Sequence, residues 1–401
     1  MKDAFITDGL RTPIGSLRGC LSQLRADDMA AFVLRKLMER NPNLPAAAID
    51  DVIMGCTNQA GDDNRNVARM ALLLAGIPYS VPGETVNRLC ASGMSAVINA
   101  ARAVKAGDGD VFIAGGLEHM TRAPWVISKT SQPFGQDAQM FDSSFGWRFI
   151  NPKMHELYGT DPMGVTAENL VDMYGISRAD QDLFAYNSQM KAAAAQKSGR
   201  FAEEIVPVEI PQKKGNPTIV ENDEFIKPTT TIEKLGELKP SFKKGGTVTA
   251  GNASGLNDGA AAMLVVSADA INKYGLTPKA RIVSSGVAGV EPKIMGIGPV
   301  AATQLALKRA GLTLADIDII ELNEAFAAQS LACMRLLGIA DNDSRVNPNG
   351  GAIALGHPLG MSGARITYSA ALELQKQQKR YALATMCIGL GQGYAVILER
   401  V

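Results

Sequence analysis

The chain repeats part of its own pattern about 270 residues later, and this repeat limits the folds that it can adopt. Residues 49–54 resemble residues 317–322, an offset of 268 (from 49 to 317). Ser92-Gly93 recurs as Ser362-Gly363, an offset of 270 (from 92 to 362). In both copies an apolar run follows the expected helix. The sequence therefore predicts two similar halves.

The repeated segments have the patterns of an α/β fold. After Ser92, the residues Met94, Val97, Ile98 and Ala101 recur at the spacing of one apolar helix face. The runs that begin at positions 111, 317 and 381 are short and apolar, which is typical of strands buried on both faces. Alternation of strand and helix predicts two mainly parallel sheets.

Residues 119–249 have no counterpart in the second half and contain stretches with proline, glycine and lysine. They are predicted to form an inserted loop domain. The expected organisation is therefore an amino-terminal half of residues 1–118 with 250–270, the insert at 119–249, and a carboxy-terminal half of residues 271–401.

Composition excludes several classes of protein. The 401 residues are 46% hydrophobic and carry 40 basic against 40 acidic side chains. A disordered chain, a collagen-like fibre and a nucleic-acid binder that relies on a general positive field are all excluded. Five scattered cysteines without a CxxC pair argue against a disulfide framework, and no apolar run approaches the ~18 residues of a membrane span. The start of the chain lacks the pattern of a signal peptide. A soluble, cytoplasmic enzyme is expected.

Cys90 and His357 are the first candidates for chemistry. Cys90 lies between an extended segment and a helix, where the helix dipole and free N–H groups favour a thiolate. The alternative is a small buried hydrophobe. His357, one of three histidines, lies in the glycine-rich loop 350–360 before Pro358 and is a candidate base. The alternative is an exposed histidine in a turn.

Two further segments follow apolar runs at the edge where α/β sheets bind ligands. Cys387 ends the run that begins at Tyr381 and precedes a glycine-rich turn, and Asn323 follows the run that begins at 317. The glycines at 389–393 resemble part of a dinucleotide-binding motif, but a strand-like segment follows where a helix is required. There is no P-loop and no GxSxG elbow, and no cysteine or histidine pair has the spacing of zinc ligands, so no metal is expected.

Four motifs together resemble the thiolases in order and separation across essentially the whole chain. They are residues 86–94 around Cys90, 323–326, 356–358 and 387–389. The resemblance implies a thiolase fold, with two duplicated βαβαβαββ halves in a five-layer αβαβα arrangement and an inserted loop domain. It also implies a homodimer or a homotetramer.

The resemblance also implies roles for the site residues. Cys90 would take the acyl group as a thioester, and His357 would accept its proton. His357 would also bind the thioester oxygen, together with a water held by Asn323. Cys387 would act as acid and base at the α-carbon, and the N–H groups of Cys90 and Gly389 would form a second oxyanion hole. An oxyanion hole suits a reaction that expels an enolate.

Coenzyme A is implied as a co-substrate, with acyl-CoA as the other partner and no cofactor bound permanently. The residues expected along its path are Lys227, Phe242, Ala250, Ser254, Met163 and Phe326. The segment 227–244 carries four further lysines that could lie near the nucleotide of CoA, at positions 234, 239, 243 and 244. The alternative for these four is a solvated loop face.

Residues 55–61, 141–152 and 158–161 are similar to those of the β-ketoadipyl-CoA (3-oxoadipyl-CoA) thiolases of aromatic compound degradation. This implies cleavage of 3-oxoadipyl-CoA by CoA to succinyl-CoA and acetyl-CoA. Arg148, beside Trp147, is the candidate partner of the distal carboxylate. The alternatives are an acetoacetyl-CoA or general 3-ketoacyl-CoA thiolase, a ketosynthase-like condensing enzyme and a CoA-binding protein without turnover.

Overall fold

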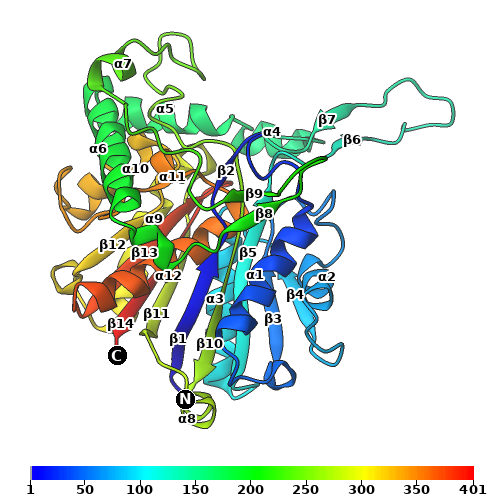
Figure 1. Cartoon of the computed structure of the whole chain (residues 1–401). Helices are drawn as coiled ribbons and strands as arrows, with labels where there is room; N and C mark the ends of the chain where they lie inside the picture. The colour runs from blue at the N-terminus through cyan, green and yellow to red at the C-terminus, as the bar shows by residue number, and fades with distance from the viewer. Residues whose placement is uncertain (1) are drawn as a thin grey trace.

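A ten-stranded mixed sheet runs through the computed structural model, which describes residues 2–401 (Figure 1). Its order is β12-β13-β14-β11-β1-β10-β5-β3-β4, and β2 pairs with β10. The strands are β1 Ala4–Arg11, β2 Gly15–Ser16, β3 Asp51–Gly55, β4 Gly83–Val86, β5 Val111–His119, β10 Asn257–Ser267, β11 Ala280–Gly289, β12 Ile319–Leu322, β13 Tyr381–Ile388 and β14 Gln392–Arg400.

The sheet consists of two halves with the same pairing pattern. In the first half β3 is parallel to β5, and β10 is antiparallel to both β5 and β1. In the second half β12 is parallel to β13, and β14 is antiparallel to both β13 and β11. The halves join where β1 pairs with β11 at Phe5 and Ile6. The predicted duplication is confirmed, since β3 and β12 contain the repeated segments.

The expectation of mainly parallel sheets is wrong. Most neighbours in the large sheet are antiparallel. β13 and β14 form a hairpin whose turn places Leu390 at φ +66° and Gly391 at φ +77°. A turn this short can join only antiparallel neighbours.

Helices and sheet halves alternate in five layers. α3 (Ser92–Ala106) and α12 (Leu359–Lys376) pack against each other between the two sheet halves. α1 (Ala26–Arg40) and α2 (Val67–Leu74) cover the outer face of the first half. α9 (Gly298–Ala310) and α10 (Ala327–Leu337) cover the second. This confirms the five-layer αβαβα arrangement.

The repeated glycines allow the two central helices to meet. A Cβ atom at Gly93 would lie 2.5 Å from the Gly360 carbonyl oxygen, and one at Gly363 would lie 2.6 Å from the Met94 nitrogen. Both are backbone atoms, so neither helix can yield locally. α3 begins at Ser92 as predicted, whereas α12 begins at Leu359, three residues before Ser362. The close contact places the amino-terminal ends of both helices, and the loops that precede them, next to each other.

Replacing Gly363 with alanine should therefore lower the free energy of unfolding by about 1–3 kcal/mol, the usual cost of an overpacked interior. Urea denaturation followed by circular dichroism measures this loss. Gly236→Ala is the matched control, because a Cβ atom there meets nothing within 4 Å. A Gly363→Ala midpoint equal to that of the original chain would contradict the close packing of α3 and α12.

The segment 119–249 supplies the elements between β5 and β10. The β6–β7 hairpin extends away from the layers (Figure 1). The elements of this segment are β6 Trp125–Ile127, β7 Met140–Asp142, α4 Pro152–Tyr158, α5 Met163–Tyr174, α6 Arg178–Lys197, η2 Arg200–Glu203, β8 Val208–Ile210, β9 Thr218–Val220 and α7 Ile232–Gly236. The domain boundaries at 118, 249 and 270 stay predictions.

Short helices complete the chain, at η1 Ala46–Ala48, α8 Ala268–Tyr274, η3 Pro292–Ile297, η4 Leu314–Asp316 and α11 Ala352–Leu355. Within residues 2–401, no helix combines the length and the apolar character needed to span a membrane.

Candidate active site

Cys90 lies in the tight turn between β4 and α3. Leu89 takes a left-handed conformation at φ +46°, and the Ser92 hydroxyl holds the turn closed. That hydroxyl accepts from the Arg88 N–H at 2.9 Å and donates to the Leu89 carbonyl at 2.7 Å. Cys90 is half-buried, two residues before the first turn of α3.

Burial raises the pKa of Cys90 to about 11. The N–H groups of Gly389 and of Cys90 itself act on the thiol in the opposite direction and lower its pKa. The expectation that the position favours a thiolate is therefore wrong for the free protein. The N–H groups have the expected effect, but loss of water around the sulfur outweighs it. Near pH 7 Cys90 is a thiol that needs a base.

Hydrogen bonds fix the tautomer of His357, in the loop before α12. The Ser362 hydroxyl donates to the Pro358 carbonyl at 2.9 Å, so its oxygen accepts from His357 Nδ1, 2.6 Å away. The backbone N–H of His357 donates to Asn257 Oδ1 at 2.9 Å and anchors the loop. Burial, with a smaller effect of Arg365, lowers the pKa of His357 to about 3. A neutral imidazole that is unprotonated at Nε2 can accept a proton there.

The Asn323 side chain lies beside the imidazole, with its Nδ2 atom 3.4 Å from His357 Nε2. Asn323 follows β12, and its backbone N–H donates to the Thr385 carbonyl of the neighbouring β13 at 3.0 Å. Among residues 2–401 its side-chain oxygen is buried without a hydrogen-bond partner. Because buried polar atoms are normally paired, this oxygen is available to a water or a substrate.

Cys387, near the end of β13, is buried in an apolar cluster with Ala325 and Phe326. Burial raises the pKa of Cys387 well above that of a free thiol, and the charge of Cys90 raises it further. Because the Gly389 N–H acts on the Cys90 sulfur, Cys90 lies close to the segment that contains Cys387. Met163 packs at the rim of this cluster, and its sulfur lies 3.7 Å from the position that a Cβ atom of Gly389 would occupy.

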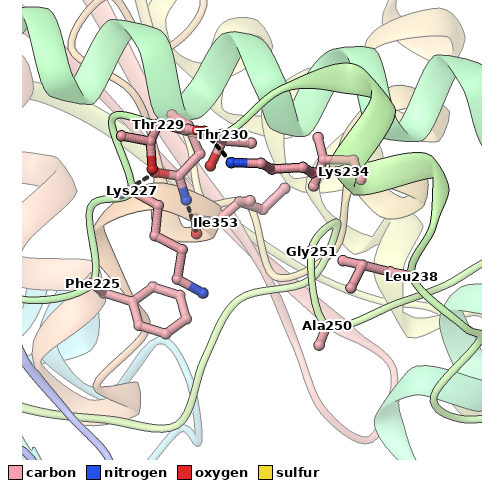
Figure 2. Close-up of a pocket in the computed structure, with 11 residues that line it drawn as sticks. Phe225, Lys227, Thr229, Thr230, Lys234, Leu238, Ala250, Gly251 and Ile353 are labelled. Carbon is pink, nitrogen blue, oxygen red and sulfur yellow. Dashed lines mark hydrogen bonds between the residues drawn. The ribbon is translucent and has the colours of Figure 1, made fainter.

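The six residues expected along the path of CoA lie in two neighbouring places. Lys227 and Ala250 line a cavity of about 330 Å³, which Figure 2 shows together with Lys234. Phe242 and Phe326 meet edge to face at 6.0 Å, in the cluster that contains Cys387 and, at its rim, Met163. The Ser254 N–H donates to the Ala325 carbonyl at 3.0 Å.

The cavity also has members that sequence reasoning did not select. For Lys234 a solvated loop face was the alternative, but it lines the cavity, and its ammonium donates to the Thr229 carbonyl at 3.5 Å (Figure 2). The Lys227 ammonium lies over the Phe225 ring, 5.0 Å from its centroid. Two cations beside an apolar wall suit a phosphorylated ligand with a long organic arm.

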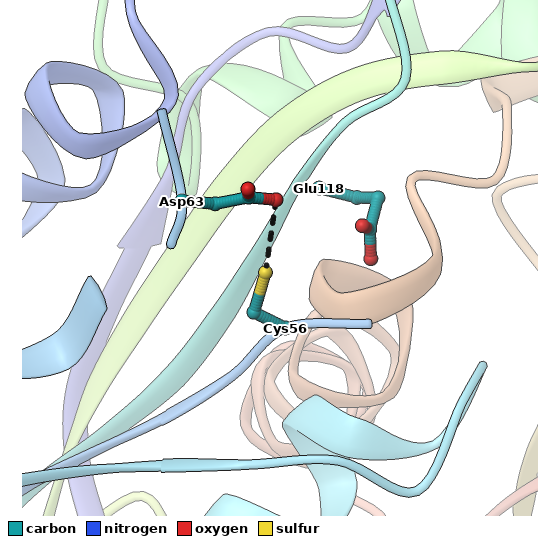
Figure 3. A group of neighbouring side chains, drawn as sticks. All are labelled: Cys56, Asp63 and Glu118. Atoms are coloured by element: carbon teal, nitrogen blue, oxygen red, sulfur yellow. Dashed lines mark hydrogen bonds between the residues drawn. The ribbon is translucent and has the colours of Figure 1, made fainter. Parts of the chain in front are cut away.

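A second buried group was also missed. Cys56, Asp63 and Glu118 place their sulfur and carboxylate oxygens within 4.8 Å of one another (Figure 3). The Glu118 carboxylate accepts from the N–H groups of Thr57, Asn58 and Gly360, the last at 2.9 Å.

The carboxylates of this group are satisfied by the chain itself. Asp63 accepts from the N–H groups of Gln59 and Gly61 and from the Cys56 thiol. We therefore assign the group to holding residues 56–63 against the start of α12. Glu118 stands at the carboxyl end of a buried strand, the signal that could have identified it from the sequence.

The pKa values of His357 and Glu118 predict a pH profile. His357 stays neutral from pH 5 to 8, so the rate of Cys90 acylation by acetyl-CoA should show no decline at the usual histidine pKa near 6.5. Burial raises the pKa of Glu118 to about 7, and protonation would weaken the hydrogen bonds that its carboxylate accepts from residues 57, 58 and 360. The acylation rate of the original chain should therefore fall as the pH drops through about 7, and this fall should be absent in Glu118→Gln. Single-turnover acylation measures both profiles. A limb near pH 6.5 that persists in Glu118→Gln would contradict the neutral imidazole.

Comparisons with known proteins agree with this fold and site. The family described as "Thiolase, N-terminal domain" matches residues 4–269, and "Thiolase, C-terminal domain" matches residues 276–400. The crystal structure of human mitochondrial 3-ketoacyl-CoA thiolase superimposes with a TM-score of 0.92 at 41% identity, covering 100% of this chain and 99% of that one. The chain belongs to the thiolase family and is a thiolase-type acyltransferase.

Curated relatives match along the whole chain. The "3-oxoadipyl-CoA/3-oxo-5,6-dehydrosuberyl-CoA thiolase" of Escherichia coli K12 is 60% identical over 401 residues, covering 100% of both chains. The "Beta-ketoadipyl-CoA thiolase" of Pseudomonas aeruginosa is 58% identical over 400 residues, again covering 100% of both.

Proposed function

We propose that this thiolase cleaves 3-oxoadipyl-CoA with CoA to give succinyl-CoA and acetyl-CoA. The observation that carries the proposal is the full-length identity of up to 60% to relatives named for this substrate. The site supports it, because the Gly389 N–H acts on the Cys90 thiol, Cys387 lies two residues before Gly389, and the neutral His357 imidazole lies in the loop before α12, which packs against α3.

The first half-reaction forms an acyl-enzyme. His357 Nε2 accepts the proton of the Cys90 thiol as the sulfur attacks the C3 ketone of the substrate. The N–H groups of Cys90 and Gly389 bind the oxyanion that forms. The C2–C3 bond then breaks and leaves succinyl-Cys90. The electron pair passes to the acetyl-CoA enolate, whose thioester oxygen is stabilised by protonated His357 and by a water that Asn323 holds, while the Cys387 thiol protonates its carbon.

The second half-reaction releases the product. The CoA thiol gives its proton to the Cys387 thiolate and attacks the succinyl thioester. The Cys90 sulfur leaves and recovers its proton from His357. The cycle ends with both cysteines as thiols, in agreement with the raised pKa of each in the free protein.

The proposed path of CoA runs from the cavity beside Lys227 to the Phe242–Phe326 pair. We assign the phosphates to Lys227, the pantetheine arm to Ala250 and Ser254, and the inner end of the path to Phe242, Phe326 and Met163. CoA enters as a co-substrate, and no cofactor is assigned as permanently bound.

The assembly and location are proposals as well. The β6–β7 hairpin and the loop between its strands expose Trp125, Ile127 and Phe134, an apolar surface that another copy of the chain would cover. A homodimer or homotetramer in the cytoplasm is proposed, and sedimentation equilibrium measures the number of subunits.

A substrate comparison tests the proposed activity. The value of kcat/KM for thiolysis should be at least about tenfold higher with 3-oxoadipyl-CoA than with acetoacetyl-CoA, because one charge-assisted hydrogen bond gives that much discrimination. A preference for acetoacetyl-CoA would instead favour an acetoacetyl-CoA or general 3-ketoacyl-CoA thiolase. Absence of thiolysis with both would favour a condensing enzyme or a binding protein.

A further inference from the structure

We propose that Lys293 binds the distal carboxylate of the acyl chain. The inference rests on the proposed function, because only a dicarboxylic substrate carries this group. It concerns a small cavity of about 10 Å³ that is formed between the inserted segment, η3 and the turn between β13 and β14.

The cavity adjoins the reacting atoms. Met163 lines it and also packs in the cluster that contains Cys387. Leu390 lines it too, and this residue directly follows Gly389, whose N–H acts on the Cys90 sulfur. In succinyl-Cys90 the carboxylate carbon is four bonds from the sulfur, or about 5–6 Å when extended. An acyl chain of this length on Cys90 would extend past Gly389 toward Leu390 and Met163, which line the cavity.

Lys293 is the cation of this cavity. Its backbone carbonyl accepts from Asn169 Nδ2 at 2.9 Å, which fixes η3 against α5. Its Cε atom lies 3.1 Å from the position that a Cβ atom of Gly159 would occupy, so the glycine leaves room for the side chain. Within residues 2–401 the ammonium makes no ion pair of 4.0 Å or less and no hydrogen bond. It is therefore available to a carboxylate.

The rest of the wall makes this cation necessary. Asp161 lines the same cavity, and its carboxylate accepts from Asn169 Nδ2 at 3.3 Å. Without Lys293, the remaining charge in the wall would repel a substrate carboxylate. With Lys293 the two charges cancel and the ammonium can pair with the ligand, while Trp147 and Met163 contact the methylene groups.

Arg148, the candidate chosen from the sequence, has a different position. Its Nη1 donates to the Ser143 carbonyl at 3.2 Å, and the neighbouring Trp147, not Arg148, lines the cavity. We therefore assign no carboxylate contact to Arg148.

The test compares 3-oxoadipyl-CoA with 3-oxohexanoyl-CoA, which has a methyl group in place of the distal carboxylate. Lys293→Met should lower kcat/KM for 3-oxoadipyl-CoA about tenfold, the lower end for a charge-assisted hydrogen bond because Lys293 is exposed, and should change 3-oxohexanoyl-CoA by less than about twofold. Lys293→Arg should keep most of the preference. Asp161→Asn should leave the preference for 3-oxoadipyl-CoA unchanged or raise it.

Two other variants control for the loss of a cation near the site. Arg148→Met and Lys153→Met, the latter on the exposed face of α4, should leave the ratio of the two kcat/KM values unchanged. Equal losses on both substrates in Lys293→Met, or no loss, would overturn the role of Lys293. The proposed function is tested separately by the original chain, since failure of that chain to cleave 3-oxoadipyl-CoA would reject the substrate itself.

Discussion

The Cys90→Ala variant is expected to form no acyl-enzyme, with a loss of thiolysis of roughly 10⁴-fold or more, as for other enzymes that lose their nucleophile. The Cys387→Ala variant should keep acylation by acetyl-CoA within about tenfold. The reason is that the CoA thiolate, with an ordinary thiol pKa, leaves without prior protonation. Rapid quenching with radiolabelled acetyl-CoA measures acylation of both variants.

The same pair of variants separates acyl transfer from proton transfer at carbon. Cys387→Ala should lose the exchange of solvent deuterium into the methyl group of acetyl-CoA, because its thiol is the acid and base at that carbon. Cys20→Ala is the control, since this half-buried cysteine lies outside the site, where its backbone N–H donates to Glu224 Oε2 at 3.0 Å. Equal loss of acylation in Cys90→Ala and Cys387→Ala would show that the division of labour is wrong.

The His357→Ala variant should acylate about 10²- to 10⁴-fold more slowly, the usual contribution of a general base. The Cys90 thiol, with a pKa of about 11, would then have to ionise without a proton acceptor. Single-turnover acylation at pH 7.5 measures the loss.

Two other variants show that the loss comes from proton transfer. Ser362→Ala should lose about tenfold, since the hydroxyl fixes the proton on His357 Nδ1 without contacting substrate. His155→Ala should have no effect, because this histidine is exposed on α4. An acylation rate in His357→Ala equal to that of the original chain would exclude it as the base.

The repeat revealed the fold from the sequence because the elements that it contains are local. Buried apolar strands and an amphipathic helix are encoded in short segments, so the offset of 268 to 270 aligned β3 with β12 and α3 with α12. Strand direction is not local. β10 pairs with β5 only after the chain has passed through the segment 119–249, and the pattern of β10 alone does not specify which neighbour it will have.

The candidate residues were accessible to sequence analysis, whereas their electrostatics were not. The position of Cys90 before a helix was correct, but its pKa depends on burial beneath segments that are distant in the sequence. The position of Glu118 at the end of a strand was visible in the sequence, but its contacts, like those of Lys293, were not. Glu118 acts on residues 57 and 360, and Lys293 gains its meaning from a cavity that the insert completes.

The most direct measurement is the location of the acyl group. The protein is mixed with acetyl-CoA, quenched in acid and digested. The mass of each cysteine-containing peptide is then measured by mass spectrometry. We expect an added acetyl group on Cys90 in the original chain and in Cys387→Ala, and none in Cys90→Ala. An acetyl group on Cys387, or acetylation that survives in Cys90→Ala, would contradict it.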